Sequence, residues 1–205
     1  MSSLTASPAA LIILIVTIVI SLIGLNRPEI LTKMMLRPYS LFRNREYEKL
    51  ITSGFVHADY GHLIFNLLTF YFFAFPLERR IGSLSFISLY FIGMVLSEIG
   101  TCLKHRNNPE YASLGASGAI LAVLFASIVY FPQSSLIMFP IPVPIPAPLF
   151  AVLYLAYTWW QSKQNTGRVN HDAHFGGALT GLAFVAVTEP RAFDRLIAVI
   201  GGYLT

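Results

Sequence analysis

The sequence has little charge and almost no cysteine. Only 12% of its 205 residues are Asp, Glu, Lys or Arg, while 55% are hydrophobic. Soluble domains carry about 25% charged residues, so the composition excludes an ordinary soluble domain and points to lipid as the solvent. The single cysteine, Cys102, excludes an intrachain disulfide.

A basic stripe typical of nucleic-acid binding is also missing. The chain has 14 Lys and Arg against 10 Asp and Glu, and most of the basic residues lie in short polar segments between apolar runs. Basic groups at the ends of apolar runs anchor a chain at lipid headgroups. We therefore expect a lipid bilayer, and no nucleic acid, as the chain's surroundings.

Apolar runs separated by polar segments predict an all-α polytopic membrane protein with a six-transmembrane-helix bundle, in one domain over residues 1–205. We expect the helices at about residues 9–25, 57–77, 84–103, 117–131, 147–161 and 173–188. No Lys or Arg precedes the first run and no small-residue cleavage site follows it, which favours a retained helix over a signal peptide.

The connections between these runs differ in kind. Residues 26–56 mix basic, aromatic and apolar side chains, which indicates a segment that lies in the membrane interface. Residues 78–83 predict a short polar turn. The uncharged, proline-rich segment 133–148 argues against helix and predicts a stiff loop. A short amphipathic tail is expected after Glu189.

Two of the predicted helices are short. At 1.5 Å per residue, residues 117–131 and 173–188 reach only about 22 and 24 Å, against a hydrocarbon core of about 30 Å. Their first turns should therefore lie below the membrane surface, in protein or beside a water-filled cavity. Because successive helices alternate direction, the second, fourth and sixth helices all start on one side of the membrane.

This topology gathers a hydroxyl, several imidazoles and an amide near one surface. Ser117 opens the fourth helix. The start of the second helix carries His57, His62 and Asn66, and the start of the sixth carries His171 and His174. Serine becomes a nucleophile when a neighbouring base accepts its proton, and histidine titrates near neutrality. We therefore predict a catalytic dyad of Ser117 and His174.

Small residues favour close approach of the two helices that carry this dyad. Gly118, Ala122 and Ala126 recur every four residues on the fourth helix, and Gly177 and Gly181 do so on the sixth. Faces of this kind let transmembrane backbones come closer than the usual distance.

An acyl-transfer reaction also needs donors for its oxyanion. The Ser117 N–H at a helix start is one candidate, and the side chains of His62 and Asn66, four residues apart on one helical face, are two more. Asp172 is two residues from His174 and so points to a different helical face. We assign Asp172 to capping the sixth helix rather than to a triad.

Three motifs resemble those of the rhomboid intramembrane serine proteases. They are residues 115–118 around Ser117, residues 173–177 with Gly181 around His174, and His57 with His62 and Asn66. The resemblance covers nearly the whole chain and includes residues 78–82, which look like the family's second-loop signature. It implies hydrolysis of peptide bonds in single-span transmembrane substrates, with Ser117 as nucleophile and His174 as general base. It also implies that no metal or cofactor is needed. The residues expected near the site are His57, Gly115, Gly118, Gly177 and Gly181. The resemblance also implies a bacterial inner membrane.

The chain departs from the family pattern at two places. Glu48-Lys49 stands where many members carry Trp-Arg, and lysine cannot reproduce bidentate arginine pairing. Leu121 stands where an aromatic residue often packs on the catalytic imidazole. We expect Leu121 to provide an apolar wall without ring stacking.

Other functions compete with the protease. A rhomboid-like protein could bind client helices without cutting, although such proteins normally lack the serine or the histidine. His171, Asp172 and His174 offer ligand types for zinc or iron. Glu98 could belong to an ion path, although we favour a cavity-facing or structural role. Ten of the 14 basic residues lie on the predicted active-site side, so the positive-inside rule places this side in the cytoplasm, whereas the resemblance implies an outward-facing site.

Overall fold

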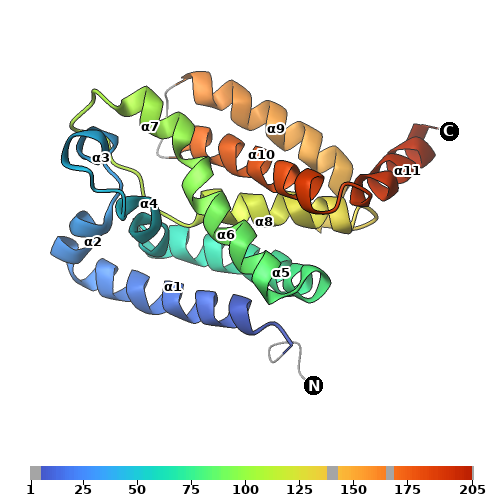
Figure 1. Cartoon of the computed structure of the whole chain (residues 1–205), viewed down its shortest axis with the longest axis horizontal. Coiled ribbons are helices and arrows are strands. Elements are labelled where there is room, and N and C mark those ends of the chain that lie inside the picture. The colour runs from blue at the N-terminus through green and yellow to red at the C-terminus, as the bar shows by residue number, and fades with distance from the viewer. Residues whose placement is uncertain (1–5, 138–142, 165–168, 205) are drawn as a thin grey trace.

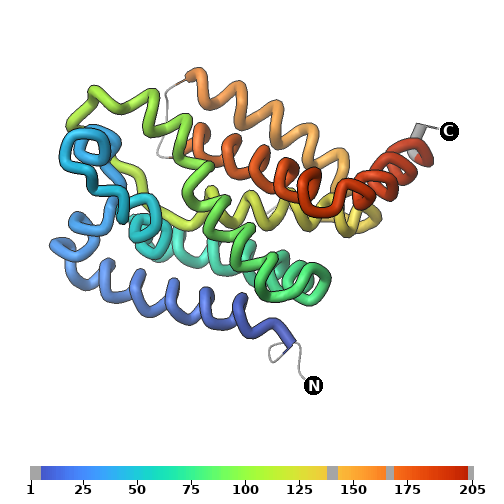
Figure 2. Tube along the Cα trace, in the orientation of Figure 1, coloured from blue at the N-terminus to red at the C-terminus, as the bar shows by residue number. Residues whose placement is uncertain are grey.

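The computed structural model describes residues 6–137, 143–164 and 169–204, and it is built almost entirely of helices. The long helices are α1 (Pro8–Asn26), α5 (Tyr60–Ile81), α6 (Ser83–Ser97), α8 (Ser117–Tyr130), α9 (Ala147–Gln164) and α10 (His171–Thr188). Figure 1 shows α8 at the centre, with α1 along one edge and α9 along the opposite edge. The order α1, α5, α8, α10, α9 across the molecule follows from their mutual contacts and is visible in the trace of Figure 2.

The helix at the centre is enclosed by protein on all sides. Every residue of α8 after Ser117 is buried, from Gly118 to Tyr130. A helix that is apolar all round belongs in the interior of a protein or of a membrane. At 14 residues, α8 is as short as the sequence predicts, about 21 Å.

Three helical segments are long and apolar enough to cross a membrane: Pro8–Asn26, Tyr60–Ile81 and Ser83–His105. The last combines α6 with α7 (Ile99–His105), and Glu98 lies at the break between them. α8 belongs to the shorter apolar helices. The predicted third helix therefore exists, but it is divided in two.

The second and third helices meet at a sharper corner than predicted. α5 begins three residues later than expected and continues to Ile81, so most of the predicted turn at 78–83 is the last turn of α5. Arg79 and Arg80 suit this position because cations are favourable near a helix C-terminus. Gly82, with φ of +80°, then ends the helix.

Glu78 belongs to this corner and joins it to the first helix. Its side chain is buried and accepts hydrogen bonds from the backbone N–H groups of Ala9 (3.0 Å) and Ala10 (2.7 Å) and from the Ser83 hydroxyl (2.6 Å). The first N–H groups of a helix have no partner within the helix. Glu78 supplies that partner and so fixes α1 against α5.

The fifth and sixth helices are each longer than predicted. α9 continues to Gln164, and α10 begins at His171 instead of residue 173. The prediction that Asp172 caps α10 is wrong. Asn170 is the cap, because its side chain accepts from the Ala173 N–H (3.0 Å), whereas Asp172 accepts from Lys104 Nζ (2.8 Å).

The connections contain short regular elements. Residues 26–56 fold into α2 (Pro28–Met34), α3 (Pro38–Asn44), α4 (Lys49–Thr52) and the 3₁₀ turn η1 (Ser53–Phe55). In the proline-rich segment, β1 (Ser135–Ile137) pairs antiparallel with β2 (Pro144–Pro146), so its described part up to Pro146 is not helical, as predicted. Residues 138–142 of that segment, and residues 165–168 of the loop before α10, lie outside the described residues. The amphipathic tail forms α11 (Ala192–Leu204).

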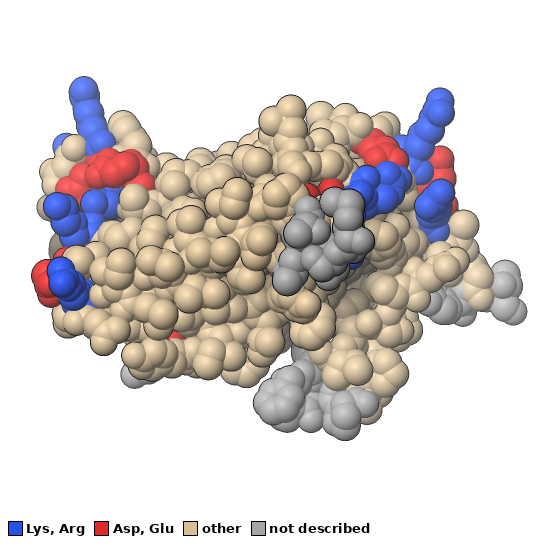
Figure 3. Space-filling view, turned by 90° about the horizontal axis from the view of Figure 1, so that it is seen from below, with Lys and Arg blue, Asp and Glu red and all other residues tan. Residues whose placement is uncertain are grey.

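The outer surface suits contact with lipid. Large apolar side chains are exposed along the outer helices, among them Ile12, Phe72 and Val152. Figure 3 shows most charged side chains of one face gathered at two opposite ends, with an uncharged band between them. This distribution is the one expected of an integral membrane protein.

Candidate catalytic site

The helices that carry the predicted dyad are in backbone contact. A Cβ atom added to Gly177 would overlap the carbonyl oxygen of Gly118, and one added to Gly181 would overlap that of Ala122. A Cβ on Gly118 would overlap the Ser97 hydroxyl of α6. The prediction of close packing through these small residues is therefore confirmed, and it sets the distance between α8 and α10.

Ser117 and His174 face each other across this contact. Ser117 is the first residue of α8, and His174 lies in the first turn of α10. The Ser117 Oγ and the His174 Nε2 are 2.9 Å apart, within hydrogen-bond distance. A nucleophile and a base at this separation are the arrangement that proton transfer from serine requires.

A buried polar network fixes the backbone just before both helices. Ser113, four residues before Ser117, donates to Glu98 Oε1 (3.2 Å). The amide nitrogen of Asn170, four residues before His174, donates to Glu98 Oε2 (3.2 Å) and to Ser113 Oγ (3.0 Å), and Thr101 donates to the Asn170 oxygen (2.9 Å). Glu98 therefore joins the segments that lead into Ser117 and His174, which agrees with the structural one of the two roles favoured for it.

His57 lies in the loop before α5, not on the helix as predicted, and it holds the peptide that precedes Ser117. Its Nε2 accepts from the Ala116 N–H (3.5 Å), so its Nδ1–H donates to Ser21 Oγ (2.8 Å), and Ser21 donates to the Phe55 carbonyl (2.8 Å). Burial, with a smaller contribution from the nearby His62 ring, lowers the pKa of His57 to about 3. Both nitrogens of the neutral His57 ring are engaged in hydrogen bonds, so the ring orients the Ala116 peptide just before Ser117.

His62 and Asn66 lie on the first turns of α5, and His62 lies beside the loop that leads into Ser117. A Cβ on Gly115 would come within 2.7 Å of the His62 Cε1, so the His62 ring lies directly against this glycine. Gly115 has φ of +112°, a conformation that favours glycine. Asn66 Nδ2 donates to the His62 carbonyl (2.9 Å), which uses one of its two N–H groups.

Tyr154 of α9 is a neighbour of His174 that the sequence analysis did not single out. Its hydroxyl is 3.0 Å from the His174 Nδ1, and the two rings are nearly parallel at 24°, with centroids 6.5 Å apart. The Tyr154 ring approaches the imidazole nearly end-on, through its hydroxyl, so it does not replace the ring stacking that Leu121 cannot provide, and the expectation for Leu121 stays a prediction. The available signal was a tyrosine inside an apolar run, because a buried phenol usually needs a hydrogen-bond partner.

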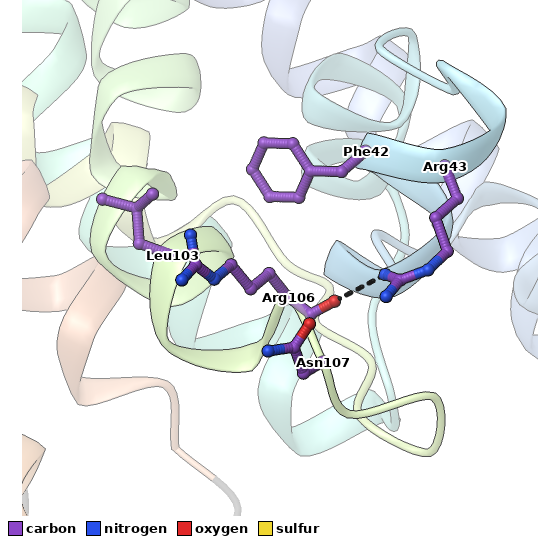
Figure 4. A pocket seen from close by; sticks show the side chains of 5 residues that line it. All are labelled: Phe42, Arg43, Leu103, Arg106 and Asn107. Carbon is purple, nitrogen blue, oxygen red and sulfur yellow. Dashed lines mark hydrogen bonds between the residues drawn. The ribbon is translucent and has the colours of Figure 1, made fainter.

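A separate hollow of about 540 Å³ lies between α3 and the end of α7 (Figure 4). Phe42, Arg43, Leu103, Arg106 and Asn107 line it, and the Arg43 guanidinium donates to the Arg106 carbonyl (2.9 Å). This bond joins α3 to the loop after α7. None of the predicted site residues lines this hollow, so we do not assign it to the reaction.

Asp172, which was considered as a metal ligand, and the single cysteine, Cys102, both have other surroundings. Within residues 6–137, 143–164 and 169–204, no group of three His, Cys, Asp or Glu side chains is placed to hold a metal ion. Asp172 is paired with Lys104. Cys102 is buried with Leu36 and Leu41, as a small packing residue would be.

Fold and site together define a class: a helical membrane protein whose interior holds a serine paired with a histidine. A family model described as Rhomboid domain matches residues 44–191. The chain therefore belongs to the rhomboid family.

Several curated relatives agree with this assignment. RHOMBOID-like protein 12, mitochondrial, of Arabidopsis thaliana is 26% identical over 167 residues, which cover 73% of this chain and 49% of the relative. Rhomboid protein 1, mitochondrial, of Saccharomyces cerevisiae is 30% identical, covering 66% and 40%. Rhomboid protease GluP of Bacillus subtilis is 27% identical, covering 88% and 36%. The chain thus spans less than half the length of these relatives, and their mixed origins do not support the bacterial inner membrane that the resemblance implied.

Proposed function

We propose that the protein is an intramembrane serine endopeptidase that cleaves single-span membrane proteins. The observation that carries the proposal is the 2.9 Å separation of Ser117 Oγ and His174 Nε2 at the partly buried starts of two helices. In this proposal α8, α9 and α10 cross the membrane with the three longer segments, which gives six spans. The site needs no metal or cofactor, because the nucleophile and its base are both side chains of this chain.

The geometry supports a defined sequence of steps. His174 Nε2 accepts the Ser117 proton while Oγ attacks the scissile carbonyl carbon, and the carbonyl oxygen becomes an oxyanion. The Ser117 N–H, the His62 ring and the free N–H of Asn66 stabilise that charge. His174 then gives its proton to the leaving amine. Water, deprotonated by the same imidazole, hydrolyses the acyl-enzyme and frees Ser117.

Labelling of the nucleophile tests the proposal without a known substrate. We expect a fluorophosphonate probe to label wild-type protein in detergent at Ser117, and His174→Ala to be labelled far more slowly, because its serine has no base. Mass spectrometry of the labelled peptide identifies the residue. Equal labelling of both proteins, or a label elsewhere, would refute the assignment.

Variants of the proposed oxyanion donors should lose rate and keep the fold. We expect His62→Ala or Asn66→Ala to lower kcat by up to about 10²–10³-fold, the cost of one lost donor in other proteases. Cleavage of a model transmembrane substrate in liposomes measures this loss. Wild-type rates in both variants would remove the two residues from the oxyanion site.

A client-binding protein without activity is the second candidate. The relatives include proteins named as proteases and others named only rhomboid-like. The presence of both Ser117 and His174 at hydrogen-bond distance favours the protease. A wild-type protein that binds transmembrane peptides but neither cleaves them nor reacts with the probe would favour the binding function instead.

A further inference from the structure

We propose that Tyr154 is the positioning residue of the base, an orienting partner that holds His174 from the neighbouring helix. This inference rests on the proposed function, since it concerns the same imidazole. In soluble serine proteases a third side chain binds the Nδ1 side of the histidine and fixes its orientation. Here the group on that side is a phenol hydroxyl, 3.0 Å from Nδ1.

The phenol ring is held firmly enough to serve this purpose. The Phe150 ring stacks on it with centroids 5.3 Å apart and planes at 23°, and the Phe125 ring lies at 6.0 Å. Phe125 is fully buried in α8, the helix that also carries Ser117. The Tyr154 ring is therefore packed by aromatic contacts that do not involve its hydroxyl. A variant that lacks only the hydroxyl should keep the ring in place and lose only the hydrogen bond to His174.

The chemistry of the dyad determines which atom donates. His174 can accept the Ser117 proton only if Nε2 carries a lone pair, and in neutral imidazole the proton then resides on Nδ1. The Tyr154 oxygen accepts that Nδ1–H. When Nε2 takes the serine proton, Nδ1 keeps its own, the ring becomes imidazolium, and the bond to the phenol oxygen becomes charge-assisted and stronger. No proton leaves Tyr154 in this step.

The other groups near His174 do not offer this contact. The His171 ring lies edge-on to the His174 ring, with centroids 5.9 Å apart. Asp172 is paired with Lys104. A neutral phenol orients the imidazole but brings no negative charge, so its contribution should be that of one hydrogen bond, about three- to tenfold in rate.

Tyr154→Phe is the test, because it removes the hydroxyl and keeps the ring. We expect kcat and the fluorophosphonate labelling rate to fall about three- to tenfold, with KM unchanged and the thermal unfolding temperature lowered by no more than a few degrees, because one hydrogen bond of the folded state is lost. In ¹⁵N spectra of imidazole-labelled protein, the His174 signals should shift away from the Nδ1–H tautomer.

Tyr157→Phe is the matched control, since Tyr157 is one turn away on α9 and its hydroxyl contacts Gln161. It should label like wild type.

The outcomes separate this inference from the proposed function. If Ser117→Ala abolishes labelling while Tyr154→Phe labels at the wild-type rate with an unchanged tautomer, the dyad stands and the role of Tyr154 is refuted. Faster labelling of Tyr154→Phe would also overturn the inference, because the hydroxyl would then favour the opposite tautomer. If wild-type protein neither labels nor cleaves, the proposed function itself fails.

Discussion

Ser117→Ala and His174→Ala should each abolish cleavage of a model transmembrane substrate in detergent and in liposomes. Alanine at position 117 removes the nucleophilic oxygen, and alanine at 174 removes the proton acceptor 2.9 Å from it. Loss of either member of such a pair costs about 10⁶-fold in kcat in a soluble serine protease. The double variant should be no worse than either single one, because the two residues act as a unit.

Matched controls separate chemistry from folding. Ser127→Ala removes a buried hydroxyl from the same helix, α8, and His105→Ala removes an imidazole that stacks on Tyr111 outside the site. Both controls should cleave within a fewfold of wild type, and all four variants should keep their helical circular dichroism. Substantial cleavage by Ser117→Ala or His174→Ala would disprove the dyad, whatever the controls do.

The close approach of Ser117 and His174 could be predicted from the sequence because the positions of both residues follow from chain direction and periodicity. Helices that alternate direction bring Ser117 and His174 to one side, and glycines at four-residue spacing predict the backbone contact that brings them together. Both inferences need only the order of apolar runs and the 3.6-residue helical repeat. The start of α8 at Ser117 is predicted to the residue, and its end to within one.

The residues that the sequence reading missed all act through tertiary contacts. Asn170 and Asp172 are both common N-cap residues, and only the positions of Lys104 and Glu98 show which one caps α10. Tyr154 looks like one more aromatic side chain in an apolar run until the packing of α9 against α10 places its hydroxyl at His174. Partner choice between distant segments does not follow from local pattern.

The glycine contact between α8 and α10 gives the second large expected effect. We expect Gly177→Ala to lower the cleavage rate at least about 10²-fold and to destabilise the protein by about 1–3 kcal/mol. The new methyl group would overlap the carbonyl of Gly118, which is backbone and cannot rotate away. The two helices must separate, and His174, three residues before Gly177 on the same helical face, moves away from Ser117. Cleavage assays and thermal unfolding in detergent measure the two losses.

Two further glycines distinguish loss of geometry from loss of stability. A methyl group on Gly181 would overlap the carbonyl of Ala122, one turn further from the dyad, so Gly181→Ala should destabilise the protein similarly but reduce the rate less. Gly202→Ala in α11 has nothing within 4 Å of the added Cβ and should leave both properties unchanged.

If Gly177→Ala kept wild-type rate and unfolding temperature, α8 and α10 would not be in the close contact described, and the 2.9 Å pair that rests on it would lose its support. If Gly177→Ala and Gly181→Ala lost rate in proportion to stability alone, the contact would hold the fold without setting the geometry of the dyad.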